Sequence, residues 1–168
     1  VYLGARKDHA GRWCVVPGQV FRDERDPDPQ RRYKMIGLDA QAHPRSGEVN
    51  TEINMVCSPD GFHWKLATER SILDHHSDTA NQVVYDPDRK RWLLYCRPTI
   101  YASGLELAPD RRHPRRRLSV MASSDLAQWS YPRTCLYPDE RDLPDYDRVS
   151  VFRYGEGFVM LYSAMDGD

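Results

Sequence analysis

Short apolar runs separated by turn-forming residues dominate the hydrophobic pattern of this chain. The runs are rich in Val, Tyr, Trp, Phe and Met, and Pro, Gly, Asp and Asn stand between them. No apolar stripe at helical spacing continues for three turns without an interruption. The pattern therefore predicts short β-strands, over residues 12–16, 32–38, 50–57, 63–67, 82–85, 91–97, 118–122, 129–136, 149–154 and 157–163. Regularly spaced strands without helices between them are typical of an all-β meander, sandwich or propeller.

An internal repeat narrows this choice. The segment CSPDGFHW at 57–64 returns as ASSDLAQW at 122–129, and Asp60 and Asp125 are 65 residues apart. We expect the third strand of each repeat to end at Ser-x-Asp and the fourth to begin at the Trp. The Ser and Asp side chains would satisfy backbone N–H groups of a tight turn, over which the Trp packs. Two coincidentally similar hairpins are the alternative.

The segments that flank this motif repeat as well. The strand–turn–strand segment 84–95 has the same form as 152–162, and 26–35 is a looser copy. A unit of about 65 residues with four antiparallel strands has the size of a β-propeller blade.

The sequence therefore predicts an all-β fold with about two and a half four-stranded blades of a β-propeller. A ring needs at least four blades, so we expect a single partial domain whose open blade edges favour self-association. Its expected parts are the end of one blade, two further blades and the first half of another: 1–17, 18–70, 71–137 and 138–168.

Charge and composition argue against several classes of protein. The chain of 168 residues has 24 Lys and Arg against 25 Asp and Glu, a balance that does not favour general nucleic-acid binding. Aromatic residues make up 11%, which argues against disorder. No apolar run approaches the roughly 20 residues of a membrane span, and no signal peptide is visible. Extracellular, periplasmic and cytoplasmic locations all stay open.

Metal and cofactor chemistry is not expected. The chain has four cysteines: Cys14, Cys57, Cys96 and Cys135. None forms a Cys-x-x-Cys pair, and their apolar surroundings favour buried free thiols, with disulfides as the alternative in an oxidising compartment. His75 and His76 are metal-ligand types beside Asp74 and Asp78, but adjacent side chains of an extended segment point to opposite sides.

Several motifs carry a resemblance to a known family. They are Asp23 with 32–35 (RYKM), 58–64 (SPDGFHW), 78–87 (DTANQVVYDP), 116–129 and 138–147. Together they resemble the five-bladed β-propeller glycosidases, which include glycoside hydrolase families 32, 43, 68, 117 and 130. The likeness is greatest to an uncharacterised family-32-like branch.

The resemblance implies that acidic residues on the first strands of successive blades face a central funnel. There one protonated carboxyl group gives its proton to the leaving oxygen, while an ionised one attacks the anomeric carbon or activates water. We expect one catalytic acid per blade, in equivalent positions: Asp23, Asp78 and Asp147. The alternative for each is a turn aspartate that caps backbone N–H groups.

The polar residues near these acids are the expected substrate-binding residues: His75, His76, Asn81 and Arg97. Arg97 can hold sugar hydroxyls, a carboxylate or a sulfate, or it can form a salt bridge at the rim. Many family members have a Glu as the acid on the third blade. Here the matching region offers Asp145 and Asp147, with Glu140 upstream.

The densest charged run is RRHPRRR at 111–117, which is expected to lie in a long loop over 99–114. It is either a solvated hairpin loop or a clamp for a polyanion such as a sulfated or uronic-acid polysaccharide. Nucleic acid is not expected, because no aromatic ladder accompanies the run.

The prediction is a glycoside hydrolase-like propeller that cleaves a poly- or oligosaccharide, with an anionic one among the candidates. The alternative is a propeller module that binds a glycan or polyanion without turnover.

Overall fold

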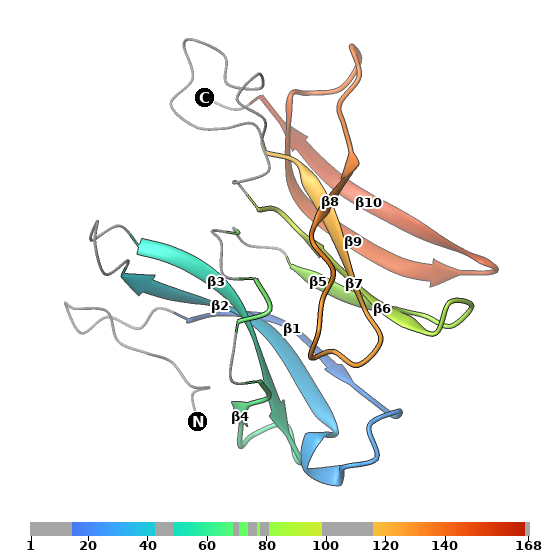
Figure 1. The fold of residues 1–168 in the computed structure, drawn as a ribbon. Helices are drawn as coiled ribbons and strands as arrows, with labels where there is room; N and C mark the ends of the chain where they lie inside the picture. The colour runs from blue at the N-terminus through green and yellow to red at the C-terminus, as the bar shows by residue number, and fades with distance from the viewer. Residues whose placement is uncertain are drawn as a thin grey trace. The chain divides into compact units, whose positions relative to one another are not determined.

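The computed structural model describes residues 15–42, 49–68, 71–73, 77, 81–98 and 116–166. The chain divides into two compact units, Val1–Ser77 and Asp78–Asp168. Their regular structure consists of β-strands (Figure 1) and one 3-10 helix, η1 (Pro29–Arg31), with no α-helix among the described residues. In that part of the chain no helix is long and apolar enough to cross a membrane.

The first unit contains an antiparallel sheet of four strands in the order β1-β2-β3-β4. Its strands are β1 (Val15–Arg22), β2 (Tyr33–Ala42), β3 (Val49–Ser58) and β4 (Lys65–Leu66). The two central strands supply most of its core, with Met35 and Ile36 on β2 and Ile53 and Met55 on β3 fully buried. Because successive side chains of a strand point to opposite faces, the burial of Met35 and Ile36 means that β2 is buried on both faces there.

Strand β1 differs from its prediction, which ended the strand at Val16. The strand continues through Pro17 and Gly18, and its pairing with β2 shifts between Pro17 and Val20. A Cβ atom at Gly18 would overlap the carbonyl oxygen of Ile36. The Pro-Gly pair therefore forms a bulge with a close backbone approach, where the sequence reading expected the strand to end.

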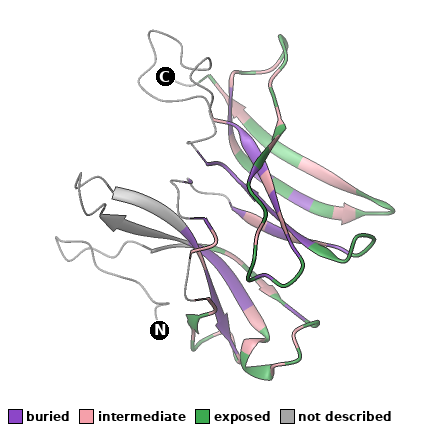
Figure 2. Cartoon of the chain, viewed as in Figure 1, coloured by how far each residue is buried: buried purple, intermediate pink, exposed green. Residues whose placement is uncertain are grey.

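The second unit contains two antiparallel sheets, β5-β6-β7-β8 and β10-β9. Their strands are β5 (Gln82–Asp86), β6 (Arg91–Cys96), β7 (Leu118–Ser123), β8 (Arg133–Leu136), β9 (Asp145–Tyr154) and β10 (Gly157–Met165). One apolar core joins the two sheets, because side chains of β6, β7 and β9 pack together, among them Leu93, Leu118 and Val151. Buried positions are frequent on β6 and β7, whereas β10 has only intermediate and exposed ones (Figure 2).

The first strands of these two sheets, β5 and β9, are adjacent. The side-chain amide of Gln82 bridges them: its Nε2 donates to the carbonyl oxygen of Val151 at 2.9 Å, and its Oε1 accepts from the Val151 N–H at 2.6 Å. Arg153 and Asp88 form a further link at 2.8 Å. Antiparallel sheets whose first strands adjoin are consistent with part of a β-propeller-like fold.

The Ser-x-Asp motif forms the same turn in both units. Strands β3 and β7 end at Ser58 and Ser123, as predicted. Oδ1 of Asp60 accepts the N–H groups of Phe62 and His63 at 2.8 and 2.9 Å. Oδ1 of Asp125 accepts those of Ala127 and Gln128, each at 2.8 Å. The two segments are therefore structural repeats.

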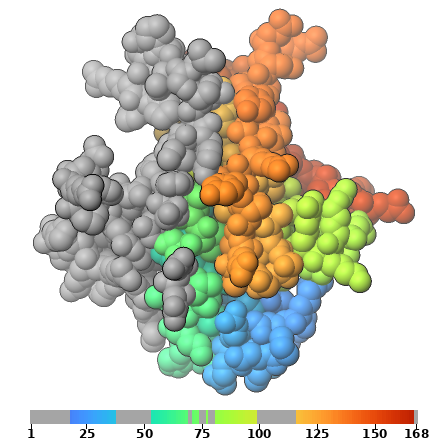
Figure 3. Space-filling model, viewed as in Figure 1, coloured from blue at the N-terminus to red at the C-terminus, as the bar shows by residue number. Residues whose placement is uncertain are grey.

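The edge strands of the second unit lie at its surface. In the space-filling view β8 and the segments beside it (orange in Figure 3) lie on the visible face, and Tyr131 and Tyr137 are exposed. Strand β10 pairs only with β9 among the described strands. Self-association through these edges stays a prediction.

Candidate functional site

Asp147 lies near the start of β9, and three guanidinium groups surround its carboxylate. Nη1 of Arg97 donates to Oδ1 at 2.9 Å. Nη1 of Arg116 lies 3.6 Å from the same oxygen, and Nε of Arg148 lies 3.5 Å from Oδ2. The Asp147 side chain is 33% exposed, so solvent reaches this carboxylate.

The buried side chain of Arg97 holds the carboxylate of Asp147 in place. Arg97 follows the last residue of β6, and only 3% of it is exposed. Its Nη1 also donates to the carbonyl oxygens of Tyr146 at 3.1 Å and of Asp147 at 2.7 Å. Of the two interpretations of Arg97, the structure shows an ion pair, but a buried one that joins β6 to β9. A role for Arg97 in holding substrate stays a prediction.

Asp147 lies inside β9, whereas the sequence reading began this strand at Val149. The strand begins at Asp145, because Tyr146 is fully buried and anchors it. The Tyr146 ring packs edge-on against that of Tyr162, with 5.1 Å between the centroids, and its hydroxyl donates to Asp142. Burial, and then the charge of Asp142, raise the pKa of Tyr146 to about 12.

Asp145, the other acid of this region, is buried and has a structural role. It is 4% exposed, and its Oδ1 accepts the backbone N–H of Arg116 at 2.8 Å. Nη1 of Arg117 donates to the carbonyl oxygen of Pro144 at 2.7 Å and lies 3.9 Å from Asp145. These contacts attach the start of β9 to the residues before β7, and they place Arg116 beside Asp147.

Asp23 does not occupy a position equivalent to that of Asp147, so this part of the prediction is wrong. It follows the last residue of β1, in the connection to β2, and Asp86 lies at the corresponding end of β5 in the next sheet, as the last residue of that strand. Asp23 therefore lies at the end of a first strand, whereas Asp147 lies near the start of one. The sequence does not distinguish the two cases, because both aspartates stand beside a short apolar run. A catalytic role for Asp23 stays a prediction.

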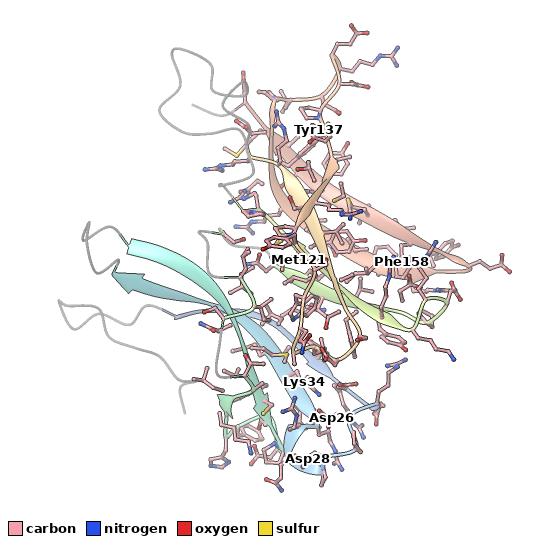
Figure 4. The ribbon with its side chains drawn as sticks, in the orientation of Figure 1. Asp26, Asp28, Lys34, Met121, Tyr137 and Phe158 are labelled. Carbon is pink, nitrogen blue, oxygen red and sulfur yellow. The ribbon has the colours of Figure 1, made fainter. Side chains whose placement is uncertain are left out.

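The Asp23 carboxylate belongs to an ion cluster with Lys34 and Asp26, the two members that Figure 4 labels. Nζ of Lys34, a side chain 1% exposed, donates to Asp23 at 2.7 Å, to Asp26 at 2.8 Å and to the carbonyl oxygen of Arg31 at 3.1 Å. Burial raises the pKa of Asp26, but hydrogen bonds from Lys34, the Asp28 N–H and Arg31 outweigh it and lower the value to about 2. This cluster holds the β1–β2 connection.

The remaining predicted site residues are only partly visible. Asp78, His75, His76 and the predicted loop 99–114 lie outside the described residues. Asn81 is buried and immediately precedes β5. Within the described ranges no group of three His, Cys, Asp or Glu side chains is placed to hold a metal ion.

Sequence reasoning missed two residues beside Asp147. Neither residue has a site role in the prediction, although Arg116 stands in the basic run and in the motif 116–129. Their signal was present, because Arg148 follows Asp147 directly and Arg116 precedes the strand β7. Only the pairing of distant strands shows that both reach one carboxylate.

The arrangement favours a charged role for Asp147. Its carboxylate oxygens lie within 4 Å of three guanidinium groups. A fixed, partly exposed carboxylate can stabilise a developing positive charge or act as nucleophile or base.

Comparisons with known proteins show the fold. No protein-family model and no curated protein matches the sequence. A solved structure described as "Glycoside hydrolase" is similar with a TM-score of 0.64 at 16% identity. Another, described as a complex of BT0996 and RGII, has a TM-score of 0.62 at 15% identity. Each match covers 88% of this protein and 41% of the solved one. The chain thus has a glycoside hydrolase-like fold and spans about two fifths of the length of these proteins.

Proposed function

We propose that this chain forms part of a five-bladed β-propeller glycoside hydrolase, similar to families 32 and 43, that cleaves a poly- or oligosaccharide. One observation carries the proposal: Asp147, on the first strand of its sheet, presents a partly exposed carboxylate that the buried Arg97 holds in place. The fold shared with a solved glycoside hydrolase supports the reaction class. The RGII complex of the other similar structure supports a carbohydrate ligand.

In this mechanism the two carboxyl groups have different tasks. Asp147 is the ionised group, which stabilises the oxocarbenium-like transition state or acts as its nucleophile or base. The proton donor to the leaving oxygen is a second carboxyl group, for which Asp78 is the predicted residue. Arg97 is a positioning residue that fixes Asp147. Asp23 stays a predicted third acid, although the buried Lys34 donates to its carboxylate at 2.7 Å.

The test is hydrolysis of a panel of oligosaccharides by the full chain and its Asp147→Asn and Asp78→Asn variants. We expect each variant to lose at least about 100-fold in kcat, the range of a missing acid or base, while sugar binding persists. Release of reducing ends measures kcat, and calorimetry measures binding.

Asp139→Asn is the matched control. Asp139 is exposed, and its Oδ1 accepts the Arg141 N–H at 2.7 Å, a contact that an asparagine oxygen can keep. This variant should hydrolyse as the unmodified chain does. Unchanged kcat in Asp147→Asn would refute the assignment.

A glycan- or polyanion-binding module without turnover is the second candidate. The observation that favours it is the excess of guanidinium groups around Asp147, which suits binding as well as catalysis. Tight binding across the panel with no hydrolysis at any pH would select this candidate.

A further inference from the structure

The guanidinium group of Arg116 has donors that its neighbours do not satisfy well. Its Nη1 donates to the thioether sulfur of Met165 at 3.0 Å, and a thioether is a weak acceptor. Its distance of 3.6 Å to Oδ1 of Asp147 is an ion-pair contact beyond ordinary hydrogen-bond length. The side chain is 38% exposed, so a ligand can reach it.

Arg148 is placed similarly on the other carboxylate oxygen of Asp147. Its Nε lies 3.5 Å from Oδ2, and 77% of the side chain is exposed. Its backbone is fixed, because the Arg148 N–H donates to Oγ of Ser163 on β10 at 3.1 Å. The two arginines therefore flank one carboxylate, and each retains donors for another acceptor.

The local charge favours an anion as that acceptor. Arg97 already donates to Asp147 at hydrogen-bond length, and Arg117 is compensated by Asp145 and by backbone carbonyl oxygens. Arg116 and Arg148 share only Asp147 as an acidic neighbour among the described residues. A guanidinium group presents parallel N–H donors that match the two oxygens of a carboxylate.

We propose that Arg116 and Arg148 bind the carboxylate of a uronic acid unit, so that the substrate is an acidic glycan. This inference rests on the proposed function, since it assigns the substrate class of the same site. Neutral sugars offer hydroxyl groups alone, which leave the excess positive charge of the two arginines uncompensated.

Binding of matched glycans tests the proposal. The probes are oligomers of galacturonate and of glucuronate and the methyl-esterified form of each, titrated calorimetrically into the full chain. We expect one acidic oligomer to bind at least tenfold more tightly than its ester. Arg116→Gln and Arg148→Gln should each weaken the acidic form at least fivefold and leave the ester within twofold.

Arg133→Gln is the control, because Arg133 is exposed on β8, where it pairs with Val120 rather than with the residues around Asp147. It should keep the preference for acid, and circular dichroism checks that all variants are folded. Equal binding of acids and esters by the unmodified chain would overturn the proposal. So would a preference that survives in both arginine variants.

The two proposals fail in different ways. Hydrolysis that Asp147→Asn abolishes, without any preference for acidic glycans, overturns the uronic acid site and supports the glycosidase. A preference that both arginine variants lose, without hydrolysis of any probe, supports the uronic acid site and overturns the glycosidase.

Discussion

Lys34 is the only cation that contacts both Asp23 and Asp26 in the described part of the chain. Removing it leaves the Asp23 carboxylate, 5% exposed, with no positive partner in the described ranges. Breaking a buried ion pair from one side costs about 3–5 kcal/mol, because the remaining charge stays away from water. We therefore expect Lys34→Met to lower the free energy of unfolding by about that amount in urea titrations.

Lys65→Met is the control for this change, since Lys65 is exposed on the edge strand β4. Exposed substitutions away from special contacts usually stay within about 0.5 kcal/mol. A loss below about 1 kcal/mol in Lys34→Met would show that the cluster adds little to the stability of this unit.

Asp26 gives the same cluster a pH dependence. Folding lowers its pKa from 3.8 to about 2, so the ionised form is the one that the fold stabilises. This contribution is complete above the ordinary value and disappears as the pH falls through the folded one. The free energy of unfolding, measured by urea titration with tryptophan fluorescence, should therefore fall between about pH 4 and pH 2. The Asp26→Asn variant should lose less stability over this pH range than the unmodified chain. An equal loss of stability in the two proteins would show that Asp26 does not cause the pH dependence.

The Ser-x-Asp turn contains one residue in the left-handed backbone conformation, which lowers stability for any residue other than glycine. Gly61 has φ +81°, and a Cβ atom there would meet nothing within 4 Å. Gly61→Ala should therefore cost only the left-handed strain, about 1–2 kcal/mol of stability in thermal or urea unfolding. At the matching position of the other repeat, Leu126 has φ +64° and is 1% exposed. Burial of its side chain offsets the strain there.

Gly157→Ala is the matched control. Its Cβ would also meet open space, but its φ lies outside the left-handed region. Alanine there should be neutral or slightly stabilising, because it restricts the unfolded chain. Equal effects at Gly61 and Gly157 would mean that the turn relaxes to another conformation.

The sequence predicted the ends of strands well where the side chains of the turn itself determine them. The Ser and Asp side chains end β3 and β7 as expected, because a short polar side chain can satisfy the N–H groups of its own turn. The expected start of the fourth strand at the Trp was wrong, since β4 begins at Lys65 and β8 at Arg133. The indole N–H groups of Trp64 and Trp129 instead donate to carbonyl oxygens inside the turn.

The candidate site was less predictable because it depends on distant contacts. Asp147 and Arg97 were both selected from the sequence, and the structure brings them into contact. Their pairing follows from the packing of β6 on β9, which no local pattern encodes. The position assigned to Asp23 failed for the same reason: the end of a strand at which an aspartate lies depends on how the strands pair.

The side chain of Gln82 on β5 connects the two sheets of the second unit. Its amide group forms hydrogen bonds with both the N–H and the carbonyl group of Val151, a residue 2% exposed. These are the bonds that the backbone of a further strand would otherwise form at the edge of β9. A buried polar group left without a partner costs about 1–3 kcal/mol. Gln82→Ala should therefore lower stability by about 2 kcal/mol and speed hydrogen exchange at the Val151 amide at least about tenfold.

The control for Gln82 is Gln128→Ala, because Gln128 is exposed in the turn after β7. It should change neither the stability nor the exchange of Val151. If Gln82→Ala instead leaves the Val151 amide as protected as before, the edge of β9 has another partner, and packing of the apolar core alone holds the two sheets together. Faster exchange confined to Val151 and its neighbours on β9 would show that the Gln82 side chain, rather than the apolar core alone, protects the part of β9 next to β5.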